Sequence, residues 1–99
     1  MSLQRKILPL IGSPVCIHWL DAQSEDSWTP MTDLALDTPP LIETYGLLIA
    51  ADEMCVVVVQ NVDTANESAS CAMTIPLGMV TSVTLLVAGK DFYFKRKAP

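Results

Sequence analysis

His18 is the only histidine of the chain, and histidine is the side chain best suited to acid–base chemistry near neutral pH. Cys16 precedes it by two positions, so on a β-strand both side chains would point to the same face. Such neighbours have Cα atoms about 6.5–7 Å apart, whereas a nucleophile and its base need heavy atoms about 2.6–3.2 Å apart. No third group in the sequence is placed to orient the imidazole. We therefore interpret His18 as a structural histidine and predict that the protein has no catalytic residues and is not an enzyme.

Metal and disulfide chemistry also find little support. The adjacent acids Asp52 and Glu53 could approach a hard cation, but one turn supplies too few oxygen ligands for a calcium site. The cysteines Cys16, Cys55 and Cys71 lack the Cys-x-x-Cys spacing of a zinc site and the even count of a disulfide framework. Each is expected to pack as a small apolar side chain. We predict no metal site and no cofactor.

Charge is distributed unevenly along the chain. All basic residues lie near the two ends, and the ten acidic residues between Ile7 and Gly89 have no Lys or Arg among them. A surface that binds phosphates must neutralise them with cations. The body of the protein therefore does not resemble a nucleic-acid-binding surface.

The C-terminal tail, residues 90–99, combines aromatic and basic side chains. Stacking on bases and contact with phosphates are the two interactions that proteins use to hold single-stranded nucleic acid. On this interpretation the candidate RNA contacts are Tyr93, Lys95, Arg96 and Lys97. The alternative is a closing strand followed by a solubilising end.

Length and composition predict one small domain that associates with other chains. The 99 residues suffice for a single domain, with a core at residues 14–88 and the tail at 90–99. Hydrophobic residues make up 51% of the chain and the mean hydropathy is +0.37, which is high for so small a volume. Some apolar surface should therefore contact another subunit.

The apolar runs are too short for membrane insertion or export. A spanning helix needs about 18 apolar residues, and the runs here are far shorter. The apolar stretch after Arg5 and Lys6 contains Pro9 and falls short of a signal peptide. We expect a cytoplasmic protein without membrane contact.

Five segments have the β-branched and aromatic composition of strands and are bounded by turn residues. They are residues 15–20, 42–51, 54–60, 71–75 and 80–87. Residues 61–70 are polar and predict a loop. Between the last two strands, Pro76 cannot continue a central ladder and Gly78 permits a tight bend, so a single turn, of 3₁₀ type, is expected.

One helix is predicted between the first two strands. Thr29 is a good N-cap, Pro30 fits the first helical position, and residues 38–40 stop the run. Trp19 is expected in the core and Trp28 against the core beside this helix. A second short helix at residues 2–8 has weaker support. Five short strands with a bend before the last favour a mostly-β, five-stranded barrel, which leaves few exposed edges.

The order of motifs resembles the Sm/LSm family of small RNA-associated barrels, and more closely the Sm-like proteins of cyanophages and other phages. The segments PVCIHWLDA, ETYGLLIAAD and MCVVVVQ are similar to the family's first motif, with Gly46, Leu48 and Asp52 at its marked positions. The segment AMTIPLGMVTSV is similar to the second motif. The phage proteins share further positions: Trp19, Asp21, Ala22, Ile75, Pro76, Gly78 and Met79. The resemblance covers about residues 15–86 and implies an Sm-like (SH3-like) barrel.

This resemblance also implies assembly into a closed homo-oligomeric ring of five to seven subunits, in which the fourth strand of one copy pairs with the fifth strand of the next. Unpaired strand edges on a small apolar barrel support such pairing independently. The expected interface residues are Met73, Ile75, Val80, Val83 and Leu85.

For function, the resemblance implies a ring associated with single-stranded RNA in the host cytoplasm, with Asp52 as the carried-over contact. Two family positions differ: Val56 stands where Sm proteins have a base-binding Asn, and Leu77 replaces a basic residue. The alternative is an acidic scaffolding module that binds a phage or host protein and no RNA. The acidic body fits this alternative directly.

Overall fold

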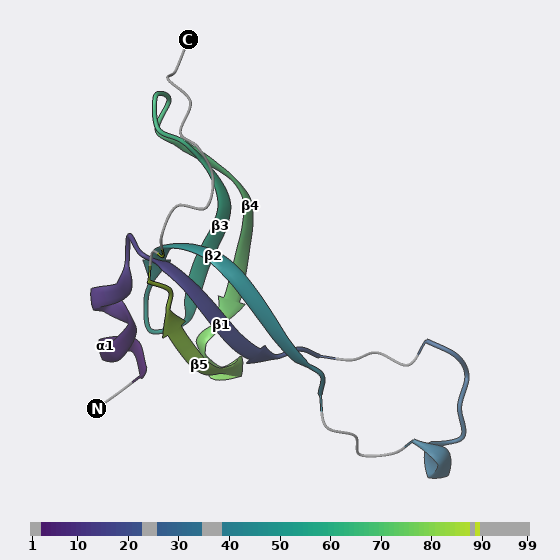
Figure 1. The fold of residues 1–99 in the computed structure, drawn as a ribbon. Helices are drawn as coiled ribbons and strands as arrows, with labels where there is room; N and C mark the ends of the chain where they lie inside the picture. The colour runs from purple at the N-terminus through teal and green to yellow at the C-terminus, as the bar shows by residue number, and fades with distance from the viewer. Residues whose placement is uncertain (1–2, 23–25, 35–38, 88, 90–99) are drawn as a thin grey trace.

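The fold is mostly β, as predicted. The computed structural model describes residues 3–22, 26–34, 39–87 and 89 (Figure 1). Its elements are α1 (Leu3–Ile7), η1 (Leu8–Leu10), β1 (Pro14–Leu20), η2 (Met31–Asp33), β2 (Leu41–Ala51), β3 (Cys55–Asp63), β4 (Ser68–Pro76), η3 (Leu77–Met79) and β5 (Val80–Leu85), where η denotes a 3₁₀ turn.

The strands form one antiparallel sheet in the order β4-β3-β2-β1-β5. Strands β1 to β4 follow one another as neighbours, and β5 returns to pair with the free side of β1. The described strands β4 and β5 are therefore the two edges of the sheet and do not pair with each other. The five-stranded sheet is confirmed, whereas closure into a barrel stays a prediction.

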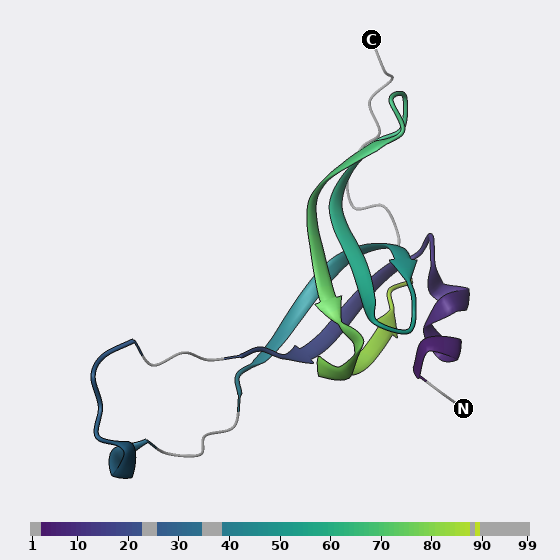
Figure 2. The same cartoon turned by 180° about the vertical axis from the view of Figure 1, so that it is seen from behind.

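The connection between β4 and β5 shows that the sheet is strongly curled. β4 ends at Pro76 and β5 begins at Val80, although these strands are opposite edges. Four chain steps span at most about 13–14 Å, whereas the edges of a flat five-stranded sheet would lie about 19 Å apart. The two edges therefore approach each other at η3, and the strands diverge from there (Figure 2).

Gly46 allows β2 and β3 to approach closely at the bend. A Cβ atom at this position would lie 2.5 Å from Val58 Cγ1 and 2.6 Å from the carbonyl oxygen of Val59. The register between β2 and β3 also shifts between Leu48 and Ala50, which is an irregularity typical of bent strands. A side chain at position 46 would force the two strands apart.

The core lies on the concave side of the curled sheet. Period-two alternation on β1 and β3 places every second side chain inside. The helix α1 contributes Ile7 from one end of the sheet, with Leu3 and Leu10 packed beside it. The buried cluster consists of Ile7, Val15, Ile17, Leu48, Val56, Val58 and Ile75.

Two sequence expectations differ from the structure. The connection between β1 and β2 contains only the 3₁₀ turn η2 among its described residues, because Pro30 and Leu34 have extended ψ angles of 136° and 115°. The α-helix is instead α1, which the sequence supported weakly. Residues 61–70 are not a loop: β3 and β4 extend across them as a hairpin, because cross-strand pairs such as Asn61 with Ser70 continue the ladder. The single turn at η3 is confirmed.

Between β1 and β2, the described residues 26–34 lie away from the sheet, and we refer to this part of the β1–β2 connection as the arm tip and to the whole connection as the arm (Figures 1 and 2). The base of the arm is closed by a hydrogen bond of 3.0 Å from the backbone N–H of Asp21 to the carbonyl of Pro40. Trp28 does not pack against the core as expected, because it is 104% exposed there.

Candidate functional site

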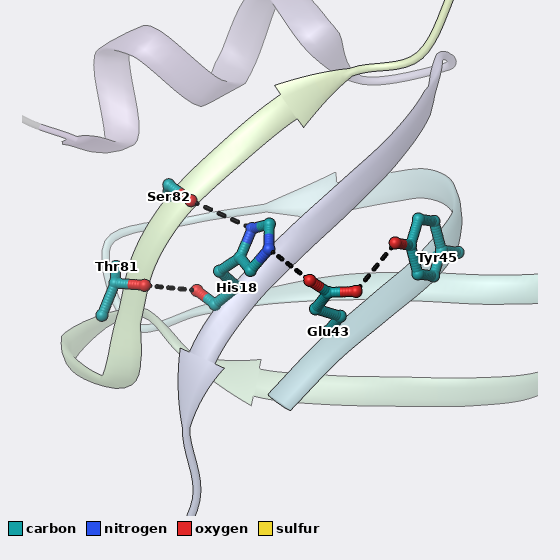
Figure 3. Close-up of polar contacts among 5 residues, drawn as sticks. All are labelled: His18, Glu43, Tyr45, Thr81 and Ser82. Carbon is teal, nitrogen blue, oxygen red and sulfur yellow. Dashed lines mark hydrogen bonds and ion pairs between the residues drawn. The ribbon is translucent and has the colours of Figure 1, made fainter. Parts of the chain in front are cut away.

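Four side chains form a continuous network on the solvent-facing side of β5, β1 and β2 (Figure 3). His18 on β1 is paired in register with Glu43 on β2 and with Ser82 on β5. Tyr45 lies two positions after Glu43 on β2 and so shares its face. We call His18, Glu43, Tyr45 and Ser82 the open-face network.

Hydrogen bonds link the four side chains in one line. His18 Nε2 lies 3.0 Å from Glu43 Oε1, and Ser82 Oγ lies 3.2 Å from His18 Nδ1. The Tyr45 hydroxyl donates to Glu43 Oε2 at 2.8 Å. Because an ionised carboxylate can only accept, the imidazole must carry its hydrogen on Nε2. In the neutral ring, Nδ1 then accepts from the Ser82 hydroxyl.

A bulge between β1 and β5 supports this arrangement. The register between the strands shifts between His18 and Trp19, which leaves Thr81 as the extra residue on β5. Its hydroxyl donates to the carbonyl of His18 at 3.1 Å. Through Thr81 and Ser82, β5 therefore contacts both the backbone carbonyl and the side chain of His18.

The network shifts two acid–base equilibria in opposite directions. Hydrogen bonds from Tyr45 and then from His18, together with the charge of His18, lower the pKa of Glu43. The hydrogen bond to Glu43 and then the contact with Cys16 raise the pKa of Tyr45 to about 12. Each shift favours the charged carboxylate beside the neutral phenol.

The hydroxyl–imidazole–carboxylate order is that of serine hydrolases, but the geometry differs in two respects. In those enzymes the serine contacts Nε2 and the acid contacts Nδ1, which is the reverse of the arrangement at His18. The N–H groups of β1 nearest to Ser82 pair with β2 and β5, so the central strand offers no donors for an oxyanion. The side chain of Glu43 is also 53% exposed to solvent. This site is suited to hydrogen bonding with a docked group.

Asp52 lies in the turn between β2 and β3, where it organises the backbone. Its Oδ1 accepts the N–H groups of Met54 at 2.7 Å and Cys55 at 2.8 Å. These bonds, that to Cys55 first, lower the pKa of Asp52. Partial burial, and then the charge of Asp52, raise the pKa of the Cys55 thiol. The carboxylate that the resemblance implies as an RNA contact thus also caps this turn.

The other candidate residues fall into two groups. Tyr93, Lys95, Arg96 and Lys97 lie outside the described residues. The five expected interface residues are on β4 and β5, at opposite edges of the sheet. Ile75, Val80 and Val83 pack in or against the core of their own chain, whereas Met73 and Leu85 are exposed.

Sequence reasoning identified His18 but missed its three partners. Glu43 and Tyr45 have the period-two spacing of one strand face, and this spacing was visible in the sequence. Ser82 comes from a strand 64 positions later, and only the register of β1 with β5 brings it to His18.

The described part of the chain contains no group of three or more His, Cys, Asp or Glu side chains arranged to hold a metal ion. None of its helices has the length and apolar character needed to cross a membrane.

Comparison with known proteins gave no match: no family model, no curated protein and no solved structure matches this chain.

Proposed function

We propose that this chain is an Sm-like assembly module whose β4 edge pairs with the β5 edge of the next copy, giving a closed ring of five to seven subunits that acts by binding and without catalysis. The observation that carries this proposal is that β4 and β5, the two edges of one curled sheet, pair with no further strand among the described residues. Such edges expose backbone donors and acceptors that readily pair with another chain. Pairing unlike edges is head-to-tail, and a ring forms when the rotation closes.

The side chains on these edges support the same pairing. β4 is exposed along nearly its whole length, although it contains Ala72 and Met73. On β5, Leu85 is also exposed. The edges carry none of the described Lys or Arg side chains that often protect free edge strands. Pairing with another copy would remove this apolar surface from water.

Light scattering coupled to size exclusion tests the ring. The wild-type protein should elute as one species of five to seven chain masses. Met73→Lys places a charge on the β4 edge and should shift the protein to single chains, since an edge lysine opposes strand addition. A wild-type protein that is monomeric at high concentration overturns the proposal.

Met54→Lys is the matched control for this variant. Met54 is exposed in the β2–β3 turn and lies on neither sheet edge. The control should therefore form the same ring as the wild type. Loss of the ring in both variants would show that added charge, and not edge pairing, is responsible.

RNA association is a second candidate for the role of the ring. It is favoured by the concentration of basic residues at the chain ends, including Arg5 and Lys6, which are exposed on α1. The alternative, a scaffold that binds a protein, is favoured by the acidic body. Because phosphate contacts strengthen as salt falls, binding to RNA should be sought at low ionic strength.

Fluorescence anisotropy with short U-rich and A-rich RNA separates these alternatives. If RNA binds, deletion of residues 91–99 should weaken binding and reduce its dependence on salt concentration, because the three cationic side chains Lys95, Arg96 and Lys97 are then lost. Binding that survives the deletion unchanged would contradict the assignment of Tyr93, Lys95, Arg96 and Lys97. Absence of binding at low salt favours the scaffold.

A further inference from the structure

The arm tip presents large apolar side chains to solvent. Trp28 is 104% exposed, Met31 is 87% exposed and Leu34 is 53% exposed. A tryptophan buries more apolar surface than almost any other side chain when it finds a partner, and tryptophan is enriched where binding energy concentrates. These three residues lie within seven positions of one another.

Local hydrogen bonds give the arm tip a defined shape. The N–H of Asp33 donates to the carbonyl of Pro30 at 2.8 Å, and the Thr29 hydroxyl donates to the carbonyl of Ser27 at 3.3 Å. Met31 begins the η2 turn and Leu34 follows it directly, so both lie within a short, ordered segment a few positions after Trp28.

The charge around these apolar residues is negative. Asp26 and Asp33 flank them within the arm tip, and the only Lys or Arg residues in the described part of the chain are Arg5 and Lys6. Both of these cations are exposed on α1. Within the part of the chain that the structure describes, positive charge that could complement the arm tip therefore lies at α1.

The segment that follows Lys6 supplies apolar surface as well. Leu8 in η1 is 42% exposed and Ile11 is 41% exposed, although Ile7 between them and Lys6 is buried in the core. The α1–η1 surface, made by Arg5, Lys6, Leu8 and Ile11, thus combines cations with apolar side chains. The arm tip combines anions with apolar side chains, so the two surfaces are complementary in charge and in character.

These two surfaces lie at opposite ends of β1. The α1–η1 surface precedes Pro14, whereas the arm begins after Leu20, about 23 Å further along the strand. The arm tip points away from α1 in both views (Figures 1 and 2). Contact between the two surfaces is therefore made between different copies of the chain.

We propose that the arm tip of one copy docks on the α1–η1 surface of a second copy, with Trp28, Met31 and Leu34 covering Leu8 and Ile11 and with Asp26 and Asp33 facing Lys6. This contact is separate from the pairing of β4 with β5. It joins single chains or complete rings equally well, so it does not depend on the proposed ring.

Fluorine NMR of protein labelled with 5-fluorotryptophan tests the docking in the full chain. The two resonances are assigned with Trp28→Phe, which alters a solvent-exposed residue. As protein concentration rises, the Trp28 resonance should shift and broaden while that of Trp19 stays in place. Asp26→Lys/Asp33→Lys and, separately, Lys6→Glu should weaken this self-association roughly tenfold or more, since like charges then meet.

Controls distinguish this contact from others. Glu53→Lys changes an exposed acid in the β2–β3 turn and should leave the concentration dependence intact. Combining Lys6→Glu with Asp26→Lys/Asp33→Lys exchanges the charges of the facing pair and should restore part of the association. Light scattering on the same variants at low concentration, where the docking contact is dissociated, should show an unchanged ring, so that failure of the ring and failure of the docking are separate results. The proposal is overturned if the Trp28 resonance does not change with protein concentration. It is also overturned if the change is the same in Asp26→Lys/Asp33→Lys and in Lys6→Glu as in the wild type.

Discussion

Leu48 in the sheet and Leu34 at the arm tip are the same residue type but differ in burial. Leu48 lies in β2 and is fully buried, whereas Leu34 follows the η2 turn at the arm tip and is 53% exposed. The sheet buries its apolar residues within one chain because two strand faces and α1 surround them. Among the described residues, none surrounds Trp28, Met31 and Leu34 of the arm tip in this way. The difference indicates that the sheet supplies stability and that the arm is free to serve contacts outside the fold.

The largest expected effect is the difference in stability between alanine substitutions of these two leucines. Leu48→Ala should lower the free energy of unfolding by about 2–5 kcal/mol, because it leaves a cavity in the core. Leu34→Ala should change it by no more than about 0.5 kcal/mol, as at other solvent-exposed sites. Urea unfolding at one fixed protein concentration measures both. A large loss for Leu34→Ala would show that the arm packs on the sheet.

Gly46 and Gly78 differ in the space available for a side chain. Gly46→Ala should destabilise the protein by about 1–3 kcal/mol, because the added Cβ meets Val58 and the backbone of Val59. Gly78→Ala is the control, since a Cβ there has nothing within 4 Å. Thermal unfolding of the two variants should differ clearly, with Gly46→Ala the less stable. Equal midpoints would contradict the tight approach of β2 to β3.

Asp52 accepts the backbone hydrogen bonds of a turn in the sheet, whereas Asp33 lies at the arm tip. Folding lowers the pKa of Asp52, so its contribution to stability is present above the unfolded-state pKa and is lost as pH falls through the folded-state value. Asp52→Ala should therefore destabilise the protein at neutral pH and flatten the loss of stability in acid. Asp33→Ala removes an exposed acid at the arm tip and should change the free energy of unfolding at neutral pH by no more than about 0.5 kcal/mol. A profile that is identical for Asp52→Ala and the wild type argues against the capping role.

The smallest effect concerns Tyr45 in the open-face network. Its pKa is raised to about 12, so the stabilisation is complete below the unfolded-state value near 10 and is lost as pH rises through about 12. Glu43→Gln removes the accepting carboxylate and should move the Tyr45 titration, followed by ultraviolet absorbance, toward 10. The same titration in a Tyr93→Phe background reports Tyr45 alone, because the chain has two tyrosines. An unmoved Tyr45 titration would exclude Glu43 as the main cause.

The strands were predictable because their signal is local. The run of valines in β3 and the alternation on β1 give segments whose positions agree with the structure within a few residues. The turn at η3 was also predictable, since Pro76 and Gly78 restrict the backbone at fixed positions. Local chemistry decides these elements.

Features that depend on register or on surroundings were harder to predict. The helix expected after Thr29 had good start and stop residues, but the described arm tip has no packed face to stabilise a helix. The hairpin at residues 61–70 has a polar composition typical of a loop, and cross-strand pairing overrides it. The contact of Ser82 with His18 requires knowledge of which strands are neighbours, which one sequence alone does not give.

The three-residue η3 turn has a consequence for the proposed ring. It joins the two strands that would contact the preceding and following subunits, so it sets the angle between those contacts inside a single chain. A ring of five needs about 72° of rotation per subunit and a ring of seven about 51°. Insertion or removal of one residue between Pro76 and Val80 would therefore be the most economical way to change the subunit number, without altering either binding edge.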